Sequence, residues 1–567
     1  MHRSEQIYAA IIENRQQEME MEKDSVAQEI EEARLQQVEA VMASEANAAQ
    51  AAAPASEKPV AKRKIKMTSL VAIALILCVV FLGVFNTLIS VVMYNPVRGV
   101  ANAPFAGLRN YEAVLGTNAF SVSIENSLII HGLQLVLALL LALPVMAGIG
   151  LAKKPGKVLT LAALCLLPVC LPGISVAQAL QALLPMTIKA NADAGALVVA
   201  LVGVLQKAGF IAFCGGLFVY LHRRGIGKGG FQGLRVGLLI SMISFLTGDL
   251  GDTMLMGNAM NRQSTQTLDY FFYQYGLQNA QFARSAAASV AQVVLQMVVA
   301  ILPAIFLCKA AKPDHDRVAL PDAKKASFTL TAGKMFWIAA LLVVTVASFG
   351  VSAFMNDPQA SLEAMVQAAA TPSVTHSLLI SVCIAALGGV AAGFAAYSFI
   401  RYFGQGGKGF GLAMILMGAA VCSTIGKYML VRNLGMINTV WGPVFAQMFD
   451  PRLVGLMIVL AIVMRMAPDR SHKGLFVSLS LLAAAFAWGD FVHGMVYVAN
   501  SSLAPVTVQL YRAMYGMGSN LSTQVSQAMV LQQQAMKPML SLLTALPALA
   551  LGGLGAGFMI RAFSKAD

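Results

Sequence analysis

Apolar runs long enough to cross a membrane recur along nearly the whole chain of 567 residues. A helix needs about 20 mostly apolar residues to span the hydrocarbon core of a bilayer. Hydrophobic residues make up 57% of the chain and charged residues only 12%, about half the charged fraction of an ordinary soluble protein. We therefore predict an all-α, polytopic membrane protein with about twelve transmembrane helices. The predicted spans are approximately 67–94, 124–150, 158–184, 196–221, 232–257, 285–308, 335–355, 376–400, 409–430, 452–467, 474–499 and 540–562.

Basic residues lie mainly in alternate connections between these spans. The segments on one predicted side are KRKIK, AKKPGK, HRRGIGKGG, CKAAKPDHDRVALPDAKK, RYFGQGGKG, RMAPDRSHK and RAFSK. The positive-inside rule places this side, and with it both termini, in the cytoplasm. The net charge of +13 is thereby explained by topology. We expect a multi-pass protein of the inner (plasma) membrane, in contact with lipid and with no nucleic-acid partner.

The first 66 residues are polar and precede the first span. Residues 1–46 are rich in Glu, Gln and Ala, contain neither Gly nor Pro, and predict a charged cytoplasmic helix. That helix is either solvated and held by Glu–Lys/Arg pairs or a docking helix for a cytoplasmic partner. An Ala/Pro and basic linker, 47–66, connects it to the membrane part. The remaining organisation is a first half (67–308), a cytoplasmic connector (309–334) and a second half (335–567).

Carboxylates interrupt two of the apolar spans. SFLTGDLGDTML (244–255) contains Asp249 and Asp252, and AWGDFVHGM (487–495) contains Asp490 and His493. A charged group inside a membrane is costly, so each carboxylate requires a partner or a function. His493 lies one helical turn after Asp490 and is a suitable partner. Either these residues line a polar cavity used by a solute or a gate, or they are structural and cap backbone amides.

Similar segments recur at offsets of about 240 to 250 residues. Gly248-Asp249 matches Gly489-Asp490, and NSLII (126–130) matches HSLLI (376–380). YFFYQYG (270–276) matches QLYRAMYG (509–516), and ILPA (301–304) matches ALPA (545–548). Six predicted spans separate equivalent points, and an even number of spans preserves direction. The pattern predicts two parallel six-helix repeats related by an axis along the membrane normal.

Several segments resemble the two permease subunits of carbohydrate ABC importers, the maltose-type family. PFAGLRNYEAVL (104–115), LPVCLPGISVAQALQALL (167–184) and the region 244–290 resemble the first subunit. SLLISVCIAALGGVAAGFAAYSFIRY (377–402), LVRNLGMINTVWGPVF (430–445) and WGDFVHGMVYVANSSLAPVTVQL (488–510) resemble the second. The resemblance implies that both permease subunits are fused in one chain. It also implies import of a carbohydrate-like solute. The partners that it implies for the chain are ATP-binding cassette subunits and an extracytoplasmic solute-binding protein.

The sequence departs from that family in the cytoplasmic loops before the fifth span of each half. Family members carry an E-A-A-x-x-x-G helix there, which docks into the ATPase. The loops here, LHRRGIGKGGFQG (221–233) and RMAPDRSHKG (465–474), are short, basic and rich in helix-breaking residues. If an ATPase binds, we expect contact through a set of basic side chains. These are Arg223, Arg224, Lys228, Arg465, Arg470 and Lys473.

Uncharged polar residues in the spans complete the predicted pathway. Gln178, Gln181, Gln206, Gln292 and Gln296 suit either carbohydrate binding or hydrogen bonding between helices. We assign Gln178, Gln206 and Gln292 to the substrate pathway, together with Asp249, Asp252, Asp490 and His493. His131 is interpreted as a packed histidine.

No motif for catalysis or for a metal site is found in a suitable context. GQGGKGFG (404–411) lacks the spacing and the hydroxyl residue of a phosphate-binding loop. We therefore expect no enzymatic activity and no cofactor on this chain, with ATP used only by a partner subunit. The alternative function is a permease-derived, non-transporting scaffold or sensor that recruits a partner through residues 1–46.

Overall fold

The computed structural model divides the chain into two units, Met1–Ile65 and Lys66–Asp567. It describes residues 67–95, 99–226, 229–247, 250–312, 339–347, 371–467, 474–515 and 527–564, and in the first unit only Arg34 and Gln37. The predicted N-terminal helix and linker, most of the connector and most of the predicted span 335–355 therefore lie outside the described residues. The rest of this section concerns the unit Lys66–Asp567.

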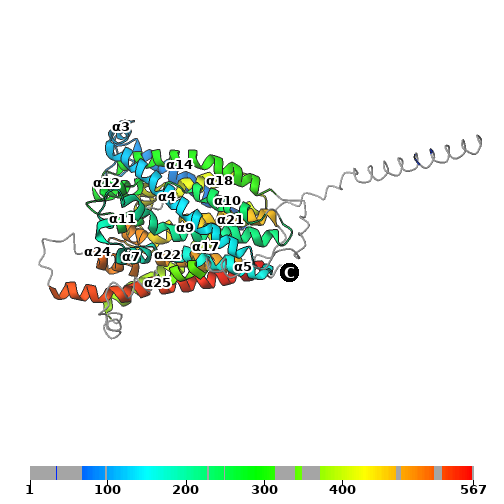
Figure 1. Ribbon diagram of the computed structural model, residues 1–567. Coiled ribbons are helices and arrows are strands. Elements are labelled where there is room, and N and C mark those ends of the chain that lie inside the picture. The colour runs from blue at the N-terminus through cyan, green and yellow to red at the C-terminus, as the bar shows by residue number, and fades with distance from the viewer. Residues whose placement is uncertain are drawn as a thin grey trace, which may run out of the picture. The chain divides into compact units, whose positions relative to one another are not determined.

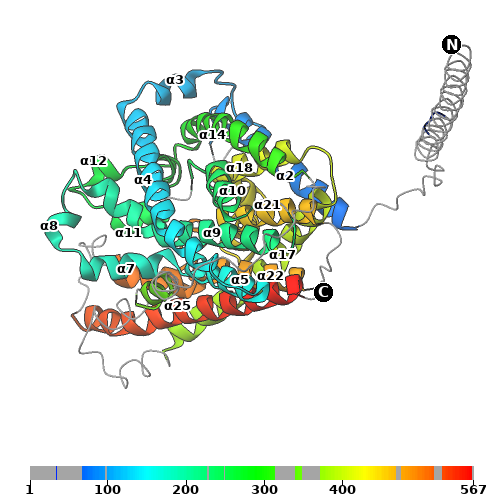
Figure 2. The same ribbon diagram turned by 45° about the vertical axis from the view of Figure 1, so that its right-hand side comes forward.

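The described part of this unit is helical, which confirms the all-α prediction (Figures 1 and 2). Among the described residues, β-pairing is limited to two isolated bridges, Val92 with Phe105 and Asn95 with Gly99. The helices of the first half are α2 (Met67–Ser90), α3 (Arg109–Leu115), α4 (Asn118–Ile149), α5 (Pro155–Leu164), α6 (Leu166–Cys170), α7 (Gly173–Leu183), α8 (Met186–Lys189), α9 (Gly195–His222), α10 (Gly230–Ile243), α11 (Leu250–Met256), α12 (Arg262–Thr265), α13 (Leu268–Phe272), η1 (Tyr273–Gln278) and α14 (Phe282–Ala310). Those of the second half are α17 (Pro372–Gly404), α18 (Phe410–Cys422), α19 (Thr424–Asn433), α20 (Trp441–Gln447), α21 (Pro451–Met466), α22 (Leu475–Gly489), α23 (Val492–Tyr497), η4 (Ser501–Leu503), α24 (Val506–Tyr515) and α25 (Gln527–Ser564).

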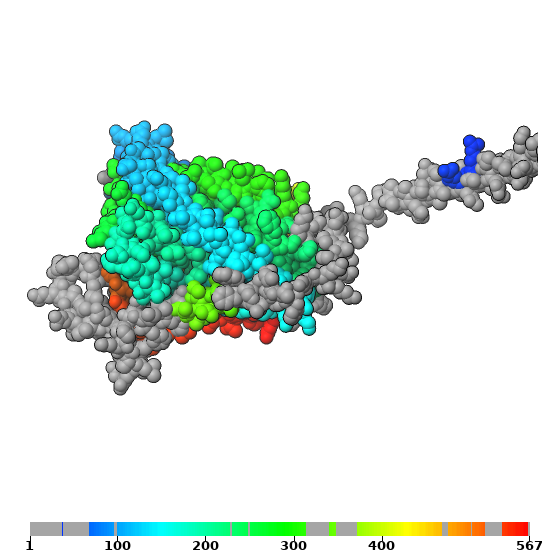
Figure 3. Space-filling model, viewed as in Figure 1, coloured from blue at the N-terminus to red at the C-terminus, as the bar shows by residue number. Residues whose placement is uncertain are grey.

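Seven of the described helices are long and apolar enough to cross a membrane, or up to nine spans if each of two bent helix pairs counts as one. This supports a polytopic membrane protein, whereas the number of twelve spans stays a prediction. Apolar side chains such as Val136 and Leu140 are more than half exposed on α4. Figure 3 shows α4 lying open along one face of the unit, as expected of a helix that contacts lipid.

Four of the predicted spans are interrupted rather than continuous. The span 158–184 bends by 74° between α6 and α7, and the span 409–430 bends by 74° between α18 and α19. The spans 232–257 and 474–499 each divide into a longer helix and a short one, α10 with α11 and α22 with α23. At the first break, Pro172 cannot donate a backbone hydrogen bond and favours an extended conformation in the residue before it, Leu171.

The two halves of the unit interlock. Helix α14 of the first half packs against α18 of the second, and α25 of the second half packs against α5 and α6 of the first. The most enclosed membrane-length segments are α9, with 78% of its most apolar window buried, and Trp441–Met466, with 83% buried. These two segments therefore form the centre of the unit, and the helix breaks face them.

Candidate functional site

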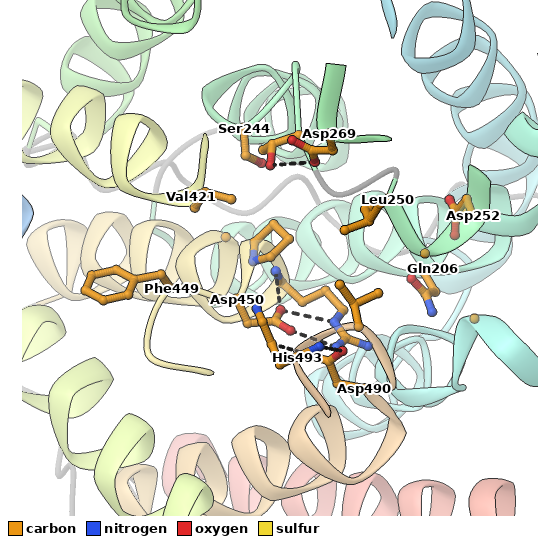
Figure 4. A pocket seen from close by; sticks show the side chains of 18 of the residues that line it. Gln206, Ser244, Leu250, Asp252, Asp269, Val421, Phe449, Asp450, Asp490 and His493 are labelled. Carbon is orange, nitrogen blue, oxygen red and sulfur yellow. Dashed lines mark hydrogen bonds and ion pairs between the residues drawn. The ribbon is translucent and has the colours of Figure 1, made fainter. Parts of the chain in front are cut away.

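A cavity of about 250 Å³ lies at the centre of the unit, where the helix breaks meet (Figure 4). Its wall contains residues of both halves. The charged and imidazole side chains that line it are His131, Lys207, Asp252, Asp269, Lys427, Asp450, Arg452, Asp490 and His493. Hydroxyl and amide groups join them, including those of Ser241, Ser244, Thr424, Gln134 and Gln206. This concentration of polar groups inside an apolar bundle is typical of a solute or ion pathway.

Two glutamines of α14 form hydrogen bonds with the backbone at the break between α10 and α11. Gln296 donates from Nε2 to the carbonyl oxygens of Met242 (3.1 Å) and Ile243 (2.8 Å), and its Oε1 accepts from the Leu246 backbone N–H (2.8 Å). Gln292 donates from Nε2 to the Leu246 carbonyl oxygen (2.6 Å). Backbone groups freed by a helix break must find partners inside a membrane. These glutamines therefore stabilise the irregular backbone that forms one wall of the cavity.

The other breaks are supported in the same way. Nε2 of Gln206 donates to the carbonyl oxygen of Leu171 at the α6–α7 break (2.6 Å). Nζ of Lys427 donates to the carbonyl oxygen of Val421 at the α18–α19 break (2.9 Å). Oγ1 of Thr507 donates to the carbonyl oxygen of Asp490 at the α22–α23 break (3.2 Å). Gln206 and Lys427 also line the cavity, so the same side chains hold the backbone and face the space.

Asp490 and His493 form a pair at the α22–α23 break. Nδ1 of His493 contacts the Asp490 carboxylate, and the backbone N–H of His493 donates to Oδ1 of Asp490 (3.2 Å). The pairing expected from their spacing is thus present. Asp490 combines the two roles considered from the sequence, because its carboxylate accepts from a backbone N–H in the first turn of α23 and also lines the cavity.

A second ionic pair marks the start of α21. Oδ1 of Asp450 accepts from the Arg452 backbone N–H (2.8 Å), which makes Asp450 the N-cap, and Pro451 follows at the first helical position. The Arg452 guanidinium donates to the same carboxylate from Nη2 (2.7 Å) and Nε (3.1 Å). It also lies over the Phe486 ring, 4.6 Å from its centroid. The pair places opposite charges on the cavity wall in a fixed geometry.

In the first half, polar side chains form a continuous network. Nζ of Lys207 donates to Oε1 of Gln134 and lies 3.3 Å from Nδ1 of His131. Nε2 of Gln134 donates to Oδ2 of Asp252 (3.2 Å). The interpretation of His131 as a merely packed residue is therefore wrong, because its ring belongs to this network and lines the cavity. Charges of both signs and several neutral donors are available to a polar solute.

Four of the residues predicted from the sequence meet at the cavity. Asp252, Gln206, Asp490 and His493 all line it. Gln292 does not line the cavity itself. It donates to the Leu246 carbonyl oxygen and to Oδ1 of Asp269 (3.3 Å).

Besides Gln292, two more of the predicted pathway residues are not part of the described cavity wall. Gln178 donates to Oγ of Ser541 on α25 (3.0 Å), an interhelical hydrogen bond. Asp249 lies outside the described residues.

Several cavity residues were missed from the sequence. Lys207 and Lys427 are single lysines inside predicted spans, a signal that could have identified them. Asp269 lies between two predicted spans, in TLDYFF, and is buried on the short helix α13 in the structure. Asp450 and Arg452 lie at a predicted span boundary, where charged residues are ordinary. Only the fold brings these residues into one wall.

Of the predicted coupling residues, Arg223, Arg224 and Arg465 lie within the described part of the chain. Arg223 donates to the carbonyl oxygens of Ala152 and Gly150 (2.6 Å to Gly150), just after α4. Arg465 donates to those of Phe403 and Gly407 (both 2.6 Å), around the end of α17.

Of the other four predicted coupling residues, only Arg224 lies within the described residues. The guanidinium of Arg224 lies over the Tyr220 ring, 5.5 Å from its centroid. Lys228, Arg470 and Lys473 lie outside the described residues.

Comparisons with protein-family models, with curated proteins and with solved structures give no match for this chain. The functional argument therefore depends on the site itself.

Proposed function

We propose that this chain is the membrane-spanning permease component of an ABC-type importer for a carbohydrate-like solute, with both permease subunits fused. The observation that carries the proposal is the polar cavity at the meeting point of four helix breaks, lined by both halves. Discontinuous helices around a central site are typical of transporters, because their free backbone groups and side chains face a water-filled pathway.

Parallel repeats are part of the proposal, and several pairs of features support them. The bent pairs α6–α7 and α18–α19 have the same bend of 74°, and α7 and α19 begin 251 residues apart (424 minus 173). Asp252 and His493 line the same cavity 241 residues apart. Arg223 and Arg465 hold the ends of α4 and α17 in the same manner. A pseudo-twofold axis through the cavity accounts for these correspondences.

The orientation and the partners follow from the same proposal. The Tyr220 hydroxyl donates to the carbonyl oxygen of Phe563 (3.0 Å), so the end of α9 lies beside the end of α25. A Cβ on Gly474 would lie 3.2 Å from Cβ of Ala562, so the start of α22 lies there too. This basic end faces the cytoplasm of the inner membrane and receives a pair of ATP-binding subunits. A solute-binding protein delivers the solute at the opposite end, which carries α12 and α24 (Figure 1).

The connections available to an ATPase are short. One lies between His222 and Gly230, and the other between Met466 and Leu475. Substitution of Arg223 or Arg465 would remove hydrogen bonds to helix-end carbonyl groups. Coupling in the first half is therefore tested at Arg224, whose guanidinium lies over the Tyr220 ring. Arg224→Glu is expected to weaken ATPase association most at low ionic strength, and its difference from the unchanged chain is expected to shrink as ionic strength rises, because charge-dominated contacts are screened over about 8 Å at 0.15 M salt.

The test of the proposal is purification from the native membrane combined with solute uptake into vesicles. We expect a nucleotide-binding subunit to copurify and uptake of a member of a sugar and polyol panel to be blocked by vanadate. Asp490→Asn in the cavity is expected to reduce that uptake, while Val136→Ala on the exposed face of α4 leaves it unchanged. Vanadate-insensitive uptake without a copurifying nucleotide-binding subunit would reject the ATP-driven function.

The shortness of these connections also favours a second candidate. Without the usual docking helix, the chain could serve as a permease-derived scaffold or sensor that recruits a partner through residues 1–46. Deletion of residues 1–46 separates the two functions. Loss of a cytoplasmic partner with unchanged uptake supports recruitment, whereas a simple uptake defect supports a role of this segment in transport.

A further inference from the structure

The cavity wall on the α24 side contains a very close contact between the two halves. A Cβ on Gly251 of α11 would lie 3.0 Å from Cγ2 of Val492 and 3.2 Å from Cε1 of Phe491, both in the second half. A side chain in place of Gly251 would require Val492 or Phe491 to shift by a few tenths of an ångström, so glycine suits this close approach. All three residues line the cavity. The two halves are thus in direct contact at this side of the cavity.

Farther from the cavity along α11, a hydrogen-bonded cluster joins the halves again. The hydroxyl of Tyr515 on α24 donates to the carbonyl oxygen of Leu255 (2.5 Å) and contacts Nε2 of Gln181 on α7. Gln181 donates from Nε2 to the same carbonyl oxygen (3.0 Å). The backbone of Gln181 is itself fixed, because its carbonyl oxygen accepts from Nζ of Lys189 (2.8 Å). Tyr515 of the second half therefore bonds to two groups of the first half that are themselves joined by a hydrogen bond.

Aromatic rings connect this cluster with the cavity. The centroids of Tyr515 and Tyr511 are 5.0 Å apart, and those of Tyr511 and Phe491 are 5.2 Å apart with nearly parallel planes. Phe491 lines the cavity and touches Gly251 as described above. A displacement of α24 would move this stack and open the wall at the same time.

We propose that Tyr515 and Gln181 form the latch of a gate that closes the central cavity on the α24 side. This inference rests on the proposed transport function, since a gate presupposes a solute pathway. Opening requires α24 to separate from α7 and α11, which breaks the Tyr515 bonds and withdraws Phe491 from Gly251. Hydrogen bonds of this kind can be exchanged for water at small net cost, so the latch is reversible.

The gate can be tested by thiol labelling of the cavity. Ser244→Cys places a reporter on the cavity wall, and a membrane-impermeant maleimide is added to right-side-out vesicles, which expose the α24 side in the proposed orientation. The protein without Ser244→Cys provides the background, because Cys78, Cys308 and Cys383 are not buried. Adding Tyr515→Phe is expected to increase the labelling rate of the reporter about tenfold, the equivalent of about 1.4 kcal/mol or one to two hydrogen bonds.

Tyr511→Phe is the matched control, because it keeps the ring stack and leaves the Tyr515 hydroxyl in place. It is expected to leave the rate unchanged. Gln181→Leu, which removes the other side of the latch, should accelerate labelling as Tyr515→Phe does. It replaces Tyr515→Phe in the experiment if that variant does not insert into the membrane. Equal rates for the reporter alone and for both latch variants would overturn the gate. The labelling needs neither ATP, ATPase nor solute, so its failure leaves the permease function to the uptake experiment.

Discussion

At the scale of single residues, buried polar side chains in this protein serve the backbone as well as the cavity. Gln206, Gln292, Gln296 and Lys427 each donate to a carbonyl group at a helix break. The sequence indicated that the glutamines were unusual but left solute binding and interhelical bonding open. The structure shows that Gln206, Gln292 and Gln296 bond backbone groups at helix breaks elsewhere in the chain, which no local pattern in the sequence identifies.

Gln296→Leu is expected to lower the free energy of unfolding by about 2–3 kcal/mol, because it leaves the Leu246 N–H and the carbonyl groups of Met242 and Ile243 without their partner. Val298→Ala, at an exposed position of the same helix, is the control. Thermal unfolding in detergent measures both. A Gln296→Leu variant as stable as the control would show that the break does not depend on this glutamine.

The Asp450–Arg452 pair gives a second prediction at this scale. Arg452→Gln leaves a buried carboxylate without its cation and is expected to cost about 3–5 kcal/mol of stability. Combining it with Asp450→Asn should recover part of the loss, since asparagine is also a good N-cap and carries no charge. Unfolding of the two single variants and the double variant measures the coupling, and strictly additive losses would contradict the pairing.

At the scale of elements, the sequence predicted where apolar helices occur but not where they break. The spans 158–184, 232–257, 409–430 and 474–499 were predicted as continuous, and each is interrupted in the structure. LPG at 171–173 was a local signal for one break. The breaks at Ser423 and Asp490 lack a proline. Lys427 of the next helix bonds the backbone at the first, and Thr507 of α24 bonds the Asp490 carbonyl oxygen at the second.

Arg465 is predicted to hold the end of α17 through its bonds to Phe403 and Gly407. Arg465→Ala should therefore increase amide hydrogen exchange about tenfold at residues 405–407, where the helix terminates, because about 1.4 kcal/mol of local stability is lost. Arg401→Lys, which changes a basic residue of the same helix end that bonds the Tyr397 hydroxyl, is the control. Unchanged exchange in Arg465→Ala would show that this arginine does not stabilise the end of α17.

At the scale of the whole molecule, residues of both halves of one chain line the central polar cavity. Composition was sufficient to predict an all-helical membrane protein, since apolar runs of this length have few other uses. The cavity could be predicted only in part. Asp252, Asp490 and His493 were recognised as costly charges within spans, whereas Asp450 and Arg452 acquire their place only when α21 packs beside the breaks.

Native mass spectrometry of the complex extracted from its own membrane tests whether one chain serves as both permease subunits. If each half offers one end to an ATP-binding subunit, as proposed, we expect a particle with one copy of this chain and two nucleotide-binding subunits. Arg224→Glu is expected to reduce the fraction of such particles, and the exposed substitution Val136→Ala is not. A particle that contains two copies of this chain, or none of the nucleotide-binding subunits, would contradict the account.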